Sequence, residues 1–148
     1  MINHKQQVYW DDILLGDELP TQEFPLSAFR LVMAAGSNRD FNSIHHNTEY
    51  AQSTGAPEMY ANNFFLQGMW EKTVRNYIGL GGVIKSLKGF RMSSFNIVGD
   101  TVRTKGKVKS KWQENGENFL ELEVWSENAT GISVGPGTIV ATVPNYEK

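Results

Sequence analysis

Two side chains in the first half of this sequence have the types and spacing needed for proton transfer. Asp40 and His45 lie five residues apart, with Asn42 between them. A carboxylate and an imidazole at this spacing can hold one water or hydroxyl from two sides, which suits moving a proton on and off a carbon beside a carbonyl. No other stretch offers so compact a polar cluster between two apolar segments.

A simpler interpretation stays open at this point. Asp and Asn side chains often bond to nearby backbone, so Asp40 and Asn42 could be turn residues. His46 adjoins His45 and invites a metal site with Asp40, but adjacent side chains rarely converge on one ion, and the chain has no cysteine. We therefore expect no metal. His4, in a polar amino terminus, is expected to be solvated.

Length and composition restrict the class of protein. The 148 residues predict one domain over 1–148, and the net charge of −2 argues against nucleic acid or an anionic membrane as a partner. The amino terminus lacks the apolar region of a signal peptide, and no apolar run approaches the ~20 residues that span a bilayer. These features favour a cytoplasmic protein.

The elements that must position the polar cluster are helical on both sides of it. Ser27 is the expected N-cap of a helix through Ala35 that ends at Gly36, and this helix is apolar on most sides, which predicts burial. Asn47 or Thr48 is expected to begin a short helix that Gly55 ends. The clearest helix covers residues 62–78, where apolar residues recur at helical spacing: Leu66, Met69, Trp70, Thr73, Val74 and Tyr77.

The second half of the chain changes to a period of two. Strands are expected at residues 83–92, 101–112, 119–125 and 132–143, with a bulge or kink at Gly135-Pro136-Gly137. An antiparallel sheet with one polar face and one apolar face must cover a helix, and the helix at 62–78 is the best candidate. The predicted fold class is therefore α+β, with one sheet wrapped around a long central helix.

The hairpin around Asn115-Gly116 allows a sharper prediction. Val102, Thr104, Val108 and Trp112 are expected on one face, and Arg103, Lys105, Lys107, Lys109 and Lys111 on the other. A two-residue turn would set Lys109 opposite Leu122 and mix the two faces. We therefore predict a longer loop of odd length that pairs Lys109 with Glu121 and Lys107 with Glu123.

The sequence resembles the MaoC-like dehydratases, hot dog folds related to the (R)-specific enoyl-CoA hydratases. The family motif Gly-Asp-x-Asn-Pro-x-His corresponds to the segment from Arg39 to His45, with Arg39 in place of Gly and Ser43 in place of Pro. The order of the later segments is similar too, so the resemblance covers residues 8–145.

The resemblance implies a single hot dog domain and reversible addition of water to a trans-2-enoyl thioester. The thioester would carry coenzyme A or, less favoured, an acyl carrier protein, and no cofactor beyond coenzyme A in the substrate is expected. The family also implies a homodimer or higher oligomer, or a heteromer with a second hot dog chain. A non-catalytic acyl-binding or structural subunit, and a hot dog acyl-CoA thioesterase, are the alternatives.

The resemblance also suggests a role for each site residue. Asp40 is favoured as the base and His45 as the partner that positions the water and carries the proton, although the sequence does not separate these two roles. Asn42 would hold the loop or orient His45. The Ala61 N–H would form the oxyanion hole, and the substrate-binding candidates are Arg39, Tyr60, Asn62 and Phe64. Lys72, Arg75 and the basic stripe at 103–111 are further candidates for phosphate, although a sheet face paired with Glu121 and Glu123 is the favoured reading of the stripe. A thioesterase would need an acid on the central helix, where the sequence offers Glu71.

Overall fold

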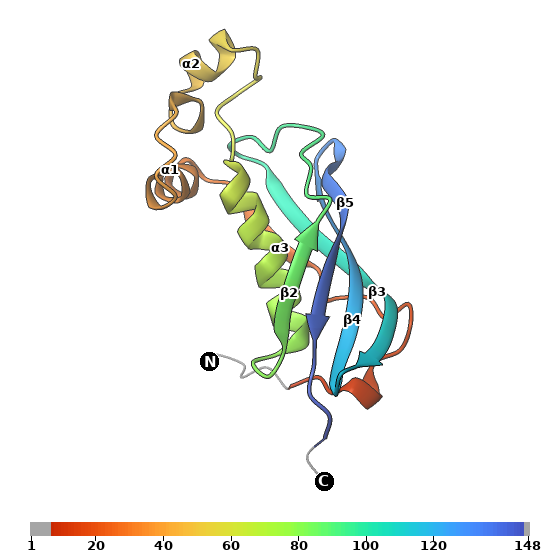
Figure 1. The fold of residues 1–148 in the computed structure, drawn as a ribbon. Helices are drawn as coiled ribbons and strands as arrows, with labels where there is room; N and C mark the ends of the chain where they lie inside the picture. Colours follow the sequence, from red (N-terminus) through yellow and green to blue (C-terminus); the bar gives the residue numbers. More distant parts are fainter. Residues whose placement is uncertain (1–6, 147–148) are drawn as a thin grey trace, which may run out of the picture.

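One antiparallel sheet curls around a central helix (Figure 1) in the computed structural model, which describes residues 7–146. The strands lie in the order β1-β3-β4-β5-β2. Their bounds are β1 Gln22–Pro25, β2 Val83–Lys88, β3 Thr101–Glu114, β4 Glu117–Asn128 and β5 Gly131–Thr142. The predicted architecture, a sheet wrapped around the helix at 62–78, is confirmed.

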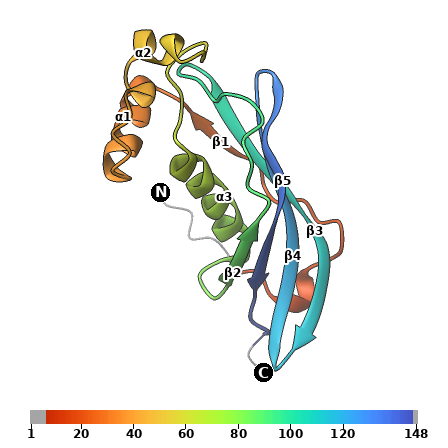
Figure 2. The same ribbon diagram turned by 45° about the horizontal axis from the view of Figure 1, so that its top comes forward.

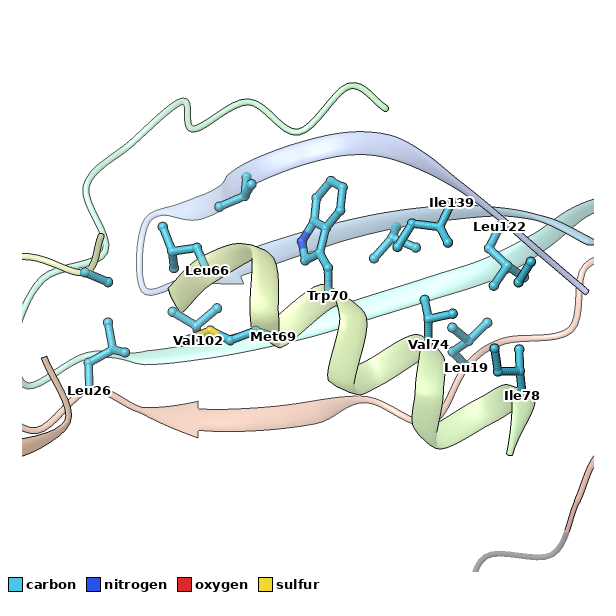
Figure 3. Packing of buried hydrophobic residues seen from close by; sticks show 14 of the residues in the cluster. Leu19, Leu26, Leu66, Met69, Trp70, Val74, Ile78, Val102, Leu122 and Ile139 are labelled. Atoms are coloured by element: carbon cyan, nitrogen blue, oxygen red, sulfur yellow. The ribbon is translucent and has the colours of Figure 1, made fainter. Parts of the chain in front are cut away.

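The central helix α3 covers Asn63–Ile78, and its apolar stripe faces the sheet (Figure 3). It begins where the Asn62 side chain accepts a hydrogen bond from the Phe65 N–H, and it ends at Gly79 with a positive φ of 71°. Leu66, Met69, Trp70 and Val74 are buried on the stripe, as their spacing predicts. Residues that repeat every three or four positions share one helix face, so local sequence is enough to place them.

Trp70 anchors α3 to the strands and explains the glycines of β5. Its indole Nε1–H donates to Ser126 Oγ of β4 at 2.9 Å. A Cβ at Gly135 or Gly137 would lie 2.8 Å from the indole ring, so the backbone of β5 passes directly over Trp70. The β4–β5 register shifts opposite this point, between Val124 and Ser126, and the predicted bulge is confirmed.

The prediction for the β3–β4 hairpin was wrong about the loop. Asn115 and Gly116 form a tight two-residue turn, both with positive φ, and Glu114 pairs with Glu117. Positive φ at both positions is the signature of a type I′ turn, whose twist matches that of the flanking strands. A β-bulge at Lys109 restores the register instead, because Val108 pairs with Leu122 whereas Ser110 pairs with Glu121.

The bulge also moves residues beyond it to the opposite face from the one predicted. Lys111 now lies opposite the buried Leu120, and its ammonium donates to the carbonyls of Trp10 and Ile13. Trp112 stacks on Phe119 at 5.3 Å between ring centroids. A bulge adds one residue to one strand, which reverses the alternation after it.

The ion pairs of the outer sheet face support the interpretation of the basic stripe as a paired surface. Lys107 does pair with Glu123 across the strands, as predicted. The predicted pair of Lys109 with Glu121 is wrong, because the bulge sets Ser110 opposite Glu121 and Lys109 contacts Glu123 at 3.3 Å. Arg103 contacts Glu23 at 2.8 Å and Lys105 contacts Glu127 at 2.7 Å. These pairs weaken the case for the stripe as a coenzyme A phosphate site.

Helices α1 and α2 stand away from the sheet at one end of the molecule (Figures 1 and 2). Helix α1 covers Ala28–Ser37 with the Ser27 cap as expected, and α2 covers Thr48–Ser53 with Asn47 as its cap. The expected burial of α1 is wrong, since Phe29 is 72% exposed and Val32 and Met33 are also exposed.

Two boundaries and one strand also differ from the predictions. The helix α1 continues through Gly36 to Ser37, and Asn38 is its C-cap. The segment at residues 8–17, whose sequence predicts a short strand or a packed arm ending in a turn, contains a short 3-10 helix, η1 (Trp10–Asp12). The short edge strand β1, which ends at Pro25, was missed. Strand β2 ends at Lys88, earlier than expected, and Met92 makes a separate bridge to Val134. A proline inside a short polar segment hides an edge strand from pattern reading.

Candidate active site

The loop between α1 and the 3-10 helix η2 (Ser43–His45) carries the polar cluster. Arg39 turns the chain out of α1 with a φ of 56°, in the left-handed region where glycine has no steric penalty. The Asp40 N–H then returns to the Ala35 carbonyl at 2.9 Å. The position where the family motif has glycine is therefore one where the backbone needs the conformation that glycine favours.

The second departure from the motif has an equally local explanation. Ser43 is the first residue of η2, and its carbonyl accepts from the His46 and Asn47 N–H groups. Proline is favoured at the first position of a helix because its missing N–H would have no partner there. Serine can adopt the same backbone, so the exchange leaves the loop geometry intact.

Asp40 and His45 lie in direct contact. The distance from His45 Nε2 to Asp40 Oδ2 is 3.0 Å, with the His45 side chain 6% exposed and that of Asp40 32% exposed. The opposite ring nitrogen, Nδ1, lies 2.7 Å from the Tyr60 carbonyl oxygen. A carbonyl only accepts hydrogen bonds, so Nδ1 carries a proton and Nε2 is the nitrogen that faces Asp40.

Asn42 holds this loop in place. Its Oδ1 accepts a hydrogen bond from the Ile44 N–H at 3.1 Å and so caps η2, which contains His45. The same residue lines the cavity at the dyad. Its placement agrees with a supporting role, although a cap of this kind is also what an ordinary turn residue would provide.

A cavity of about 350 Å³ opens in front of the dyad. Besides Asp40, Asn42 and His45 it is lined by Ile44, Tyr60, Ala61, Asn63, Phe64 and Met92. Tyr60 and Phe64 were expected here, whereas Ile44, Asn63 and Met92 were not. The first helical turn was a usable signal for Asn63, but no local pattern could bring Met92 to the site because it arrives through its bridge to β5.

Tyr60 presents a phenol beside the carboxylate. Its ring meets the His45 imidazole edge-on at 5.4 Å between centroids. Burial raises the pKa of Tyr60, and the negative charge of Asp40 raises it further. The phenol therefore stays protonated at neutral pH and adds a possible hydrogen-bond donor, not a second negative charge, to the cavity wall.

The expected oxyanion donor is already used. The Ala61 N–H donates to the Asn96 carbonyl at 2.9 Å, because Tyr60 and Ile97 form a β-bridge at this point. Among the described residues, the next N–H groups along the chain without an acceptor are those of the N-cap Asn62 and of Asn63 and Phe64, the first two residues of α3. The first N–H groups of a helix have no partner inside it, and they lie at the positive end of its dipole.

The remaining substrate-binding candidates lie outside the cavity. Arg39 is exposed and does not line the cavity, and Asn62 is 2% exposed, where its Oδ1 caps α3. The Asn62 Nδ2 atom is buried without a hydrogen-bond partner among the described residues. Both residues therefore shape the backbone around the cavity and do not line it.

The other charged candidates on α3 also lie elsewhere. Arg75 donates to the carbonyls of Gly79 and Gly82 and so closes the helix end, while Lys72 is exposed. Glu71, the acid that a thioesterase would need, accepts from Gln67 on an exposed face and does not line the dyad cavity. His4 lies outside the described residues.

Metal-binding clusters and membrane-spanning helices were both sought in the described part of the chain. Within residues 7–146, no group of three or more His, Asp or Glu side chains is arranged to hold a metal ion. In the same range, no helix has the length and apolar character needed to cross a membrane.

Comparison of the sequence with known proteins identifies a related hydratase subunit. No family model matches the chain. The 3-oxo-4,17-pregnadiene-20-carboxyl-CoA hydratase beta subunit of Mycobacterium tuberculosis is 30% identical over 101 residues, which are 68% of this chain and 74% of that protein.

Solved structures with a similar fold include hydratases and dehydratases. The ChsH1–ChsH2 complex of Mycobacterium tuberculosis matches with a TM-score of 0.78 and 23% identity, covering 89% of this chain and 98% of the other. The R-hydratase PhaJ1 of Pseudomonas aeruginosa matches with a TM-score of 0.83 and 17% identity, covering 94% and 87%. A MaoC-like dehydratase is 25% identical with a TM-score of 0.80, covering 94% of this chain and 42% of the other. The chain therefore belongs to the hot dog family of MaoC-like dehydratases and (R)-hydratases.

Proposed function

We propose that this protein adds water reversibly to a trans-2-enoyl thioester at the Asp40–His45 dyad, with coenzyme A as the thiol carrier. The observation that carries the proposal is the 3.0 Å contact between His45 Nε2 and Asp40 Oδ2 at the wall of a cavity. Family membership supports the reaction class, and the motif positions support the two residues.

The positions of the protons on His45 and Asp40 are compatible with hydration. Because Nδ1 keeps its proton for the Tyr60 carbonyl, the 3.0 Å contact needs one further proton between Nε2 and Oδ2. Without that proton, Nε2 and Oδ2 are both acceptors, and a single water can donate one hydrogen to each.

Hydration then follows as one cycle of the dyad. A water held by Asp40 and His45 loses a proton to the pair as its oxygen bonds to C3 of the enoyl group. The electron pair of the C2–C3 double bond moves toward the thioester oxygen, and the dyad returns its proton to C2. Water supplies every atom added, and the dyad ends as it began. The two residues act on one proton as a unit.

The thioester oxygen needs N–H donors as its negative charge develops. We assign this role to the first turn of α3, at Asn63 and Phe64, in place of Ala61, whose N–H donates to Asn96. Both residues line the dyad cavity. Asn62 contributes by capping the helix, which fixes where these N–H groups point.

The direct test is hydration of crotonyl-CoA, followed by loss of the enoyl absorbance. We expect Asp40→Asn and His45→Ala each to lower kcat by about 10²- to 10⁴-fold, the usual contribution of a positioned acid–base group. His46→Ala is the matched control, since His46 is the exposed neighbour of His45 and should keep activity near wild type. Full activity in both dyad variants, with their folds intact by circular dichroism, would refute the assignment.

We also propose that the chain is the active member of an oligomer of hot dog chains, either two copies or a copy with a second chain. The related hydratase is described as a beta subunit, which supports an assembly. Size-exclusion chromatography with light scattering, coupled to the hydration assay, tests this. A monomer with full activity would contradict the proposal.

A further inference from the structure

Gly68 lies in the middle of α3, and no neighbouring atom of the described residues requires a glycine there. Apart from the backbone of α3 itself and the two adjoining residues, a Cβ built at this position meets no heavy atom of residues 7–146 within 4 Å, whereas one at Gly137 would collide with Trp70 and with the Lys88 carbonyl. Glycine inside a helix lowers stability by about 1 kcal/mol relative to alanine. The space at Gly68 is therefore not needed for this chain's own packing.

The space belongs to a groove of about 630 Å³ between α1 and α3. Its apolar walls include Phe24, Phe29, Met33, Phe64 and Met69, with Gly68 among the lining residues. Arg30 is the one charged residue in the lining, and its guanidinium donates to the Pro25 carbonyl. The lining contains no carboxylate, so the groove suits an uncharged, apolar occupant.

The groove adjoins the dyad cavity through Phe64. This side chain is 64% exposed and lines both spaces. Gly68 follows Phe64 by four positions and so lies on the same face of α3, one turn further along. A molecule with its carbonyl at the start of α3 can therefore extend past Phe64 and over Gly68.

We propose that this groove binds the acyl part of the thioester, and that the preferred substrates carry a large apolar acyl group. The inference rests on the proposed function, because it places the thioester carbonyl in the dyad cavity. A volume of about 630 Å³ lies within the range of roughly 300–1,000 Å³ that holds drug-sized ligands. A four-carbon enoyl group would leave most of the groove empty.

The test uses two leucines placed at helical glycines. Gly68→Leu fills the groove from its wall, and the absence of neighbours around the Cβ means that the helix can accept it. Gly36→Leu is the matched control: Gly36 is also helical, also lacks neighbours within 4 Å, and is not part of the groove lining. Circular dichroism and thermal unfolding check both folds.

The first measurement is calorimetric binding of butyryl-CoA and dodecanoyl-CoA, which cannot be hydrated. Wild type and Gly36→Leu should bind dodecanoyl-CoA more tightly than butyryl-CoA by about tenfold or more, the effect of burying roughly two methylenes. Gly68→Leu should remove most of that preference. An equal affinity of wild type for both ligands, or a preference that survives in Gly68→Leu, would overturn the proposal.

The second measurement is kcat/KM for enoyl-CoAs of four and twelve carbons, and it separates the two proposals. Loss of chain-length preference in Gly68→Leu, with turnover retained, supports the groove. Turnover of both substrates without any preference in wild type overturns the groove and leaves the hydratase assignment standing. Chain-length-dependent binding without turnover of either substrate overturns the hydratase assignment alone. A changed oligomeric state in Gly68→Leu would assign the groove to a protein interface and overturn its role in acyl binding.

Discussion

The bond between the Trp70 indole and Ser126 should be measurable as a coupling energy that holds α3 on the sheet. Trp70 is fully buried, and its Nε1–H donates to Ser126 Oγ at 2.9 Å. Ser126 Oγ also lies 3.2 Å from Thr104 Oγ1, so removing the indole does not leave the serine without a partner. Removing the indole N–H therefore leaves no buried polar group without a partner, whereas removing the Ser126 hydroxyl leaves the indole N–H buried without an acceptor.

The magnitudes follow from that asymmetry. Trp70→Phe loses a hydrogen bond worth about 1 kcal/mol net and leaves a small void, for a total of about 2–3 kcal/mol in the free energy of unfolding. Ser126→Ala leaves the indole N–H buried without an acceptor, which costs about 1–3 kcal/mol. In the double variant that second penalty is absent, so the combined loss should be about 1 kcal/mol or more below the sum.

Urea unfolding of the four proteins, followed by far-ultraviolet circular dichroism, gives the free energies. Independent sites add within about 0.3–0.5 kcal/mol. Additivity within that range would refute the reasoning, because it would mean that the indole and the serine do not interact. A change in the slope of unfolding with urea would instead show that a variant alters the compactness of one of the two states.

Two further predictions concern the turn before the dyad and the outer face of the sheet. Arg39→Gly should raise the free energy of unfolding by up to about 1 kcal/mol and keep hydration activity, because it relieves a positive φ at an exposed position; a lower melting temperature would contradict this. Hydrogen bonds from Lys105 and Trp125 lower the pKa of Glu127, so its contribution to stability is present above the usual carboxyl pKa and is lost as the pH falls through the lowered value. Glu127→Gln should therefore reduce stability by less than about 1 kcal/mol at pH 7, and the difference from wild type should vanish on acidification; a difference independent of pH would exclude this mechanism.

The hairpin shows where sequence reasoning stopped. The alternation of Val102, Thr104 and Val108 identified the strand and its buried face. The sequence also showed that a two-residue turn would pair apolar positions of β3 with charged positions of β4. Either a loop of odd length or a β-bulge can remove this mismatch. The protein uses a bulge at Lys109, and that choice depends on how the turn twist at Asn115-Gly116 fits the curled sheet.

The predicted burial of helix α1 was wrong for a different reason. Apolar residues on several sides predict burial when the rest of the same chain supplies the cover. Here Leu31 and Ala35 face the chain, while Phe29, Val32 and Met33 remain exposed. The spacing of apolar residues indicates that a helix face avoids water but not what covers that face, and in our proposal Phe29 and Met33 are covered by the acyl group.

The sequence by itself determined the central helix, four of the five strands and the spacing that makes Asp40 and His45 a candidate dyad. These are local properties, because helix spacing, strand alternation and loop length act within a few residues. Only the tertiary structure decided that Nδ1 of His45 faces the Tyr60 carbonyl, that the Asn96 carbonyl accepts from the Ala61 N–H, and that Phe64 lines both the dyad cavity and the neighbouring groove. Those contacts join residues far apart in the chain, and hydrogen-bond partners of that kind are fixed only when the whole sheet closes around α3.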